Sequence, residues 1–251
     1  MKRNDNSSSA RKKFSLNSII IQSPLLKKAL GTVFANYEGV TTDLKRLKFK
    51  KPFAPFIHRW EKFQEVKNNE TDETTKKHLE LLWDTLEFEL RETIVTQKDL
   101  IANGVITHDY LWTMLEPGCL VLQKSSDFER VVVVQSSSYD YGAETLEMKT
   151  LMVEWDGEQF GMESEEHKID HFEGTRKISE LSMVPLLYHD DSDGVQQRCI
   201  ARGRSWEQLC GYHFKAYKGV GTNIDGAKFN IESRIIIVRC PSLVFSPIIS
   251  M

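Results

Sequence analysis

Three arginines lie close together late in the chain, in a run that also contains glycines and aromatic residues. They are Arg198, Arg202 and Arg204. Guanidinium groups bind carboxylates and phosphates through paired hydrogen bonds, so this cluster could contact an anion or an acidic protein partner. The arginines could instead pair with acidic neighbours, which are Asp190, Asp191, Asp193 and Glu207. The sequence favours this pairing within the chain, and an anion or partner contact site is the alternative.

Other reactive arrangements do not occur in the sequence. A P-loop requires G-x-x-x-x-G-K-[ST], and this pattern is missing. Gly219-Val220-Gly221 is glycine-rich but has no lysine, so we expect a flexible loop there. No cysteine–histidine spacing matches a zinc site, and the Asp190–Asp193 cluster lacks the glutamate that would complete a calcium loop. We therefore predict no catalytic residue, no metal and no cofactor.

A helix over about 194–217 is expected to carry the arginine run. Apolar and aromatic residues recur near one face of it, including Trp206 and Tyr217. Gly203 and Gly211 would then lie in the helix interior, where glycine costs about 1 kcal/mol relative to alanine. We expect a packing reason for both glycines, namely the close approach of another backbone.

The first half of the chain is predicted to be helical. Residues 1–22 are basic and polar without periodicity, so we expect a disordered tail. Ser23 and Pro24 are typical of a helix start. Leucines, Trp83 and Ile94 follow at spacings of three and four over 72–102, which predicts one long helix.

The second half is predicted to be built from β-hairpins. Strands are expected over 119–124 and 128–135, and again over 146–155 and 160–169 around Asp156-Gly157. A shorter strand over 178–187 and a late one over 231–238 complete the set. The fold class is therefore α+β, with a helical part followed by an antiparallel sheet and one late helix packed on it. We predict one domain over 23–240, with a helical part at 23–116, a sheet part at 117–240, and an irregular tail at 241–251.

The composition restricts the function classes and the compartment. The 251 residues carry a net charge of −3, so no nucleic-acid partner is expected. No apolar run approaches the roughly 20 residues of a membrane span. Four scattered cysteines favour a reducing compartment, and the basic N-terminus has no apolar segment for secretion. We expect an intracellular protein, cytoplasmic or nuclear, with a mitochondrial transit peptide as the alternative.

Several blocks, spread over about residues 23–220, resemble one family. They include Pro52-Phe53-Ala54-Pro55-Phe56, Leu100-Ile101-Ala102-Asn103-Gly104, Trp155-Asp156-Gly157 and the run from Ala201 to Tyr217. The chain resembles a domain of unknown function that precedes the ATPase module of fungal AAA+ proteins. The resemblance implies an accessory domain with no catalytic residues to transfer. It also implies an ATPase module that this sequence lacks, so we expect a truncated product.

Three functions follow as hypotheses. The first is a non-catalytic accessory domain that binds a protein partner or an AAA+ module. The second is a fragment of an AAA+ ATPase whose ATP binding and hydrolysis reside in a missing C-terminal module. The third is a nucleotide or small-ligand enzyme, and it depends only on Arg202, Arg204 and the loop at Gly219–Gly221. The sequence does not specify the oligomeric state.

Overall fold

The computed structural model describes residues 16–124, 129–140, 142–223 and 225–238. Two compact units make up the chain, Met1–Ala102 and Asn103–Met251. The sequence predicted one domain with a helical part ending at 116, whereas the division falls directly after the long helix. The predicted irregular tail at 241–251 lies outside the described residues.

The α+β class is confirmed, because a largely helical first unit precedes a hairpin-built antiparallel sheet. The first unit contains β1 (Ser18–Ile21), α1 (Pro24–Val33), β2 (Leu47–Lys50), α2 (Ala54–His58), α3 (Trp60–Asn69) and α4 (Glu73–Ala102). The prediction of disorder over 1–22 is wrong at its end, because Ser18–Ile21 pairs antiparallel with Leu47–Lys50. Three consecutive isoleucines favour a strand, and β2 supplies the partner that local sequence could not reveal. The first fifteen residues of the predicted tail lie outside the described part.

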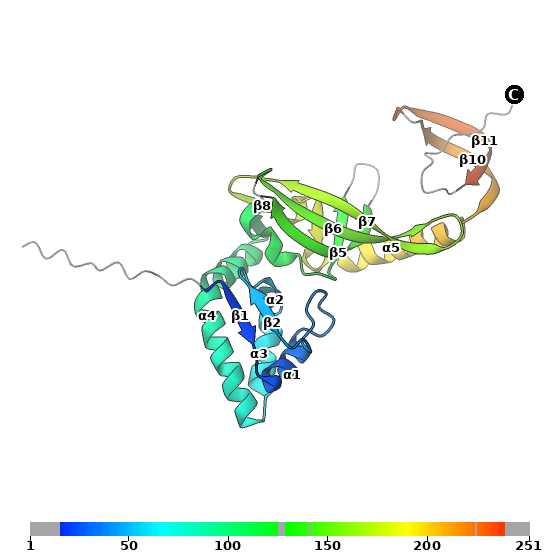
Figure 1. The fold of residues 1–251 in the computed structure, drawn as a ribbon. Coiled ribbons are helices and arrows are strands. Elements are labelled where there is room, and N and C mark those ends of the chain that lie inside the picture. The colour runs from blue at the N-terminus through cyan, green and yellow to red at the C-terminus, as the bar shows by residue number, and fades with distance from the viewer. Residues whose placement is uncertain (1–15, 125–128, 141, 224, 239–251) are drawn as a thin grey trace, which may run out of the picture. The chain divides into compact units, whose positions relative to one another are not determined.

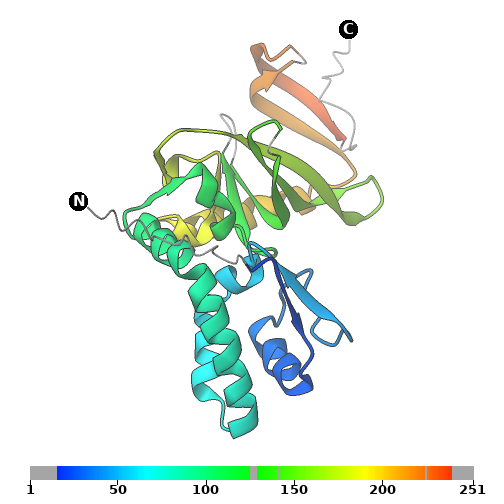
Figure 2. The same cartoon turned by 60° about the vertical axis from the view of Figure 1, so that its left-hand side comes forward.

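Aromatic rings fill the core of the first unit. Phe56 is fully buried, and its ring centroid lies 4.7 Å from Phe49, 5.1 Å from Phe34 and 5.5 Å from Phe63. Such edge-to-face packing contributes beyond the burial of area alone. Figure 2 shows the short helices and the β1–β2 ribbon beside the long α4, which supplies Trp83 to the same core.

The long helix α4 matches its predicted range and buries the predicted stripe. Its buried residues are Thr75, Leu79, Leu82, Trp83, Leu86, Leu90 and Ile94. Asp72 begins the helix, because its carboxylate accepts hydrogen bonds from the backbone N–H and the hydroxyl of Thr75, both at 2.8 Å. These bonds lower the pKa of Asp72. In the described part of the chain, neither this helix nor any other has the length and apolar composition needed to cross a membrane.

The second unit is built on a five-stranded antiparallel sheet (Figure 1) with strand order β7-β6-β5-β4-β9. Its strands are β4 (Leu120–Lys124), β5 (Glu129–Asp140), β6 (Thr145–Trp155), β7 (Phe160–Asp170) and β9 (Met183–Pro185). A short ribbon pairs β3 (Val105–Thr107) with β8 (Thr175–Lys177), and 3₁₀ turns occupy His108–Met114, Ile178–Glu180 and Leu186–Tyr188. The Asp156-Gly157 turn joins β6 to β7 as predicted, with two backbone N–H groups donating to the Asp156 carboxylate.

The predicted helix over 194–217 is wrong beyond residue 207. Helix α5 spans Ser192–Glu207, and the chain then forms β10 (Tyr212–Thr222) and β11 (Lys228–Val238). Gly211 has φ of 92°, a left-handed conformation that ends the helical region at little cost for glycine. The late strand exists, but it pairs only with β10 in a two-stranded sheet of its own. The glycines expected to form a loop, Gly219 and Gly221, lie inside β10.

Candidate functional site

Some of the residues selected from the sequence meet at one end of the second unit. The Phe160 ring, at the start of β7, lies 4.8 Å from Trp155 at the end of β6 and 5.2 Å from Trp206 in the last turn of α5. The Asp156-Gly157 turn joins the two strands next to this contact. The aromatic residues of two separate sequence blocks therefore attach α5 to the β6–β7 hairpin, which is a packing role.

The three arginines do not converge on a common point. Arg198 forms an ion pair with Asp191 at 2.8 Å and a longer one with Glu129 at 3.4 Å. Pairing with Asp191 is the structural alternative that the sequence favoured, and it lowers the pKa of that carboxyl. Arg202 donates to the backbone carbonyl of Glu129, while Arg204 is exposed. Two of the three guanidinium groups thus contact Glu129 at the start of β5, and the exposed Arg204 is not one of them.

The remaining motif residues differ from their predicted roles. Gly203 is helical, but a Cβ at this position would meet nothing within 4 Å, so the expected close approach of another backbone is wrong. Gly211 follows the helix instead of interrupting it. Tyr217 lies on β10, and its hydroxyl donates to the carbonyl of Val220 at 2.9 Å. Folded back in this way, the Tyr217 ring occupies the space that a Cβ at Gly219 would need.

The β10–β11 hairpin exposes several apolar side chains, and the most exposed of them share one face. Strand register places Phe214 opposite Ile236 and Val220 opposite Asn230, so these residues share a face with Tyr212. We call Tyr212, Phe214, Val220 and Ile236 the aromatic face of the hairpin. Tyr212 is 79% exposed and Phe214 is 77% exposed. No other helix or strand of the described chain packs extensively against either strand.

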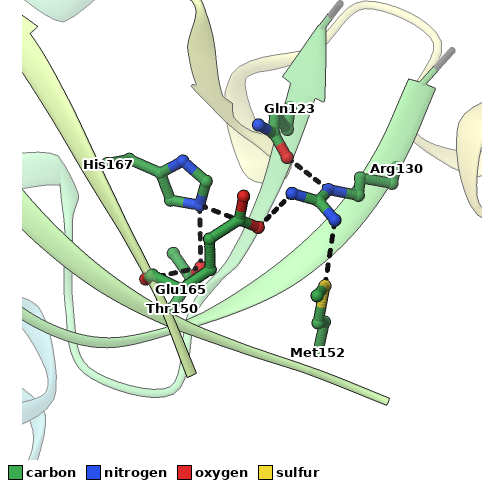
Figure 3. Close-up of polar contacts among 6 residues, drawn as sticks. All are labelled: Gln123, Arg130, Thr150, Met152, Glu165 and His167. Carbon is green, nitrogen blue, oxygen red and sulfur yellow. Dashed lines mark hydrogen bonds and ion pairs between the residues drawn. The ribbon is translucent and has the colours of Figure 1, made fainter. Parts of the chain in front are cut away.

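A polar network crosses β4, β5, β6 and β7 (Figure 3) and was not found from the sequence. The Arg130 guanidinium donates to Glu165 and to Gln123, and it also contacts the sulfur of Met152 at 2.9 Å. His167 Nε2 lies 3.0 Å from the Thr150 hydroxyl and 3.6 Å from the Glu165 carboxylate. Only the strand register brings these side chains together, because Thr150 lies opposite Glu165 and next to His167 on one face. The polar run at 163–168 is the available signal in the sequence, and alone it indicates only a strand that faces solvent.

The network resembles a hydroxyl–imidazole–carboxylate triad in composition but not in geometry. In such a triad the carboxylate holds one imidazole nitrogen and the hydroxyl faces the other. Here the same nitrogen, Nε2, faces both groups. Thr150 is also fully buried, so no substrate could reach its hydroxyl. The arrangement can stabilise the sheet, and it cannot relay a proton from Thr150 to Glu165.

One buried cysteine and the arrangement of possible metal ligands bear on reactivity. Burial and the nearby Glu116 carboxylate raise the pKa of the Cys119 thiol to about 12, so it stays protonated and weakly nucleophilic at neutral pH. Within the described residues, no three histidine, cysteine or carboxylate side chains are grouped to hold a metal ion.

The polar network predicts a pH-dependent stability. Burial lowers the pKa of His167, and the Arg130 charge acts in the same direction against the opposing Glu165 charge. The unfolded chain, with a histidine pKa of about 6.5, therefore binds more protons than the folded chain as the pH falls. We expect the stabilisation from His167 to be complete above about pH 7.5 and to decrease as the pH falls through 6.5. Urea unfolding between pH 5 and 8 measures it, and His167→Gln should flatten this part of the profile. An unchanged profile in that variant would contradict the assignment.

Comparison with known proteins finds one partial similarity. Residues 96–190 match a family described as Domain of unknown function (DUF7025). The matched segment contains the end of α4 and the five-stranded sheet with its polar network, and it ends before α5 and the β10–β11 hairpin. Neither a curated protein nor a solved structure matches the chain. The resemblance to the region that precedes a fungal AAA+ module stays a prediction.

Proposed function

We propose that this chain is a non-catalytic recognition module whose β10–β11 hairpin binds a polypeptide partner. The observation that carries the proposal is the exposed aromatic face on a strand pair against which no described element packs extensively. A two-stranded hairpin is only marginally stable in water without further packing. Burying one large apolar side chain contributes about 1.5–3 kcal/mol, so a partner that covers this face would stabilise the hairpin.

The charges on the same face indicate the chemistry of the partner. By strand register, the aromatic face also carries Lys218, Lys228 and Arg234, against one carboxylate, Glu232. Lys218 and Glu232 pair across the strands at 2.8 Å, and the exposed Arg234 adds a further positive charge to this face. The chain as a whole has a net charge of −3, so this basic surface is a local feature. Opposite potentials on two surfaces favour their association, and the partner segment should therefore combine apolar and acidic side chains.

The proposal assigns no bond-making step to the chain. Its support is that Glu165 is engaged in the network with Arg130, and that burial keeps the Cys119 thiol protonated. An AAA+ module is the partner that the sequence resemblance suggests, and it can be tried directly. The exposed Arg204 would add a second basic contact for an acidic partner.

A peptide display library tests the proposal even though the partner is unidentified. The full chain should enrich peptides that combine apolar and acidic residues. Phe214→Ala should weaken binding of those peptides by at least about 30-fold, the size of a central interface residue. Leu187→Ala is the matched control, because Leu187 is a similarly exposed apolar residue outside the hairpin. Binding is measured by calorimetry. Arg234→Glu should also weaken binding of the enriched peptides relative to the native chain.

Two results would overturn this assignment. Peptides that bind the Phe214→Ala chain as tightly as the native chain would place recognition elsewhere. A folded chain that enriches no peptide and binds no AAA+ module would argue against a recognition role altogether. Turnover of ATP by the purified chain would show instead that the protein is an enzyme.

A further inference from the structure

The register of the β10–β11 hairpin (Figure 1) determines which of its backbone groups point away from the hairpin. The N–H of Asn223 donates to the carbonyl of Ala227 at 3.0 Å, one step beyond the pair formed by Thr222 and Lys228. In an antiparallel ladder, opposed pairs alternate between those that exchange hydrogen bonds and those that do not. The odd-numbered residues of both strands therefore bond across the hairpin. The N–H and carbonyl groups of the even-numbered residues point outward, along its two outer edges.

The outer edge of β10 is interrupted by the side chain of Tyr217. Its hydroxyl donates to the carbonyl of Val220, which is one of the outward-pointing groups. The Tyr217 ring also lies beside Gly219, where an added Cβ would be 2.8 Å from the tyrosine oxygen. A strand that approached this edge would have to displace the ring. The edge of β10 is therefore a poor site for another strand.

The outer edge of β11 has no comparable obstruction among the described residues. In this part of the chain, β11 pairs with β10 and with no other strand. Outward groups belong to Asn230, Glu232, Arg234 and Ile236. The Ser233 hydroxyl donates to the Arg234 carbonyl at 3.3 Å, but a carbonyl has two lone pairs and can accept a second bond. Backbone donors and acceptors that repeat at every second residue match another extended backbone, so this edge specifies what can cover it.

We propose that the polypeptide partner of the hairpin binds as a third strand along the outer edge of β11. This inference rests on the recognition role proposed above and specifies its geometry. The added strand exchanges hydrogen bonds with Asn230, Glu232, Arg234 and Ile236. In this mode of binding, main-chain hydrogen bonds provide the affinity and alternate side chains provide the specificity.

The side chains beside this edge indicate the sequence of the added strand. Directly opposed residues of neighbouring strands place their side chains on the same face, which here is the aromatic face. Among the described residues no carboxylate pairs with the exposed Arg234, whereas Glu232 is already paired with Lys218. An acidic residue should therefore lie opposite Arg234. An apolar residue should lie opposite Ile236, which separates the added strand from Phe214. The partner should thus carry an acidic and an apolar residue two positions apart.

N-methylation of an enriched peptide tests whether it binds as a strand. An N-methyl group removes one backbone donor and adds a methyl group in the plane of the sheet. In an added strand, methylation at alternate residues should weaken binding at least about tenfold, because those N–H groups bond to β11. Methylation at the intervening residues should change the affinity by less than about threefold. Calorimetry measures both series, and equal effects at all positions would overturn the proposal.

Two proline variants test which edge is used. Glu232 and Lys218 lie opposite each other, so Glu232→Pro and Lys218→Pro break the same ion pair. Each variant also places proline where the native N–H points outward, a position that an edge strand tolerates. Glu232→Pro should weaken peptide binding at least about tenfold, although loss of its carboxylate alone would favour an acidic peptide. Lys218→Pro is the matched control and should stay within about threefold of the native chain. Equal losses, or the reverse order, would overturn the assignment to β11.

Amide hydrogen exchange distinguishes this inference from the proposed function. A saturating peptide should slow exchange at Asn230, Glu232, Arg234 and Ile236. A peptide that depends on Phe214 but does not slow this exchange would overturn strand addition and leave the recognition role intact. If the chain enriches no peptide, both proposals fail. Slow exchange at these residues in the chain without peptide would show that the chain itself, or a second copy, covers the edge, and would also overturn the inference.

Discussion

Replacing Phe56 by alanine is expected to lower the free energy of unfolding of the first unit by about 3–5 kcal/mol, the usual cost of removing a buried aromatic ring. Phe56 is fully buried between Phe34, Phe49 and Phe63. The four rings lie at the end of α1 and in β2, α2 and α3, so the cavity would open where these four elements meet. Close packing around the site leaves the neighbouring rings little freedom to fill the gap.

Amide hydrogen exchange in α1 and α3 measures this change for the first unit alone. Leu44→Ala is the control, because Leu44 is an exposed apolar residue of the same unit. Its effect should stay within about 0.5 kcal/mol, as for most surface substitutions. A loss below about 1 kcal/mol for Phe56→Ala would show that the ring cluster is not the core of this unit.

A second large effect is expected for Val195→Asp in α5. Val195 is the only buried residue of this helix, and the ion pairs of Arg198 lie on the exposed surface. Exposed ion pairs contribute at most about 1 kcal/mol each. An unpaired carboxylate in the position of Val195 should cost several kcal/mol and release α5 from the sheet.

The released helix should exchange its amide hydrogens at least about 100-fold faster over Ser192–Glu207, because several kcal/mol correspond to factors of that size. Ile200→Asp is the matched control on the same helix, since Ile200 is 53% exposed. It should leave the exchange unchanged. Equal exchange in Val195→Asp and the native chain would mean that the arginines, and not Val195, hold the helix.

Helix α5 (Ser192–Glu207) and the strand β10 that follows it show where sequence patterns become ambiguous. Trp206, His213 and Tyr217 have spacings that fit a helix, while Tyr212 and Phe214 alternate as in a strand. The strand forms because Lys228–Val238 provides a register partner for all eleven residues of β10. Pairing with β11 favours the strand over a continued helix. A short stretch of sequence around residues 208–217 does not reveal this pairing.

The candidate sites likewise include residues that the sequence identifies and residues that only the folded structure brings together. The arginine run and the Trp155-Asp156-Gly157 block were identifiable from composition, and the structure assigns them mainly to packing. The network of Arg130, Glu165 and His167 could not be predicted, because its members come from strands whose register was unknown.

By itself the sequence determined the α+β class, the range of α4 and its buried stripe, and the turn at Asp156-Gly157. These features depend on residues within a few positions of one another, where periodicity and turn chemistry act directly. Only the tertiary structure decided that β10 is a strand, that Ser18–Ile21 joins a sheet, and which apolar residues remain exposed. Those outcomes depend on contacts between segments that are distant in the sequence. Such contacts contribute free energy only when folding brings the segments together.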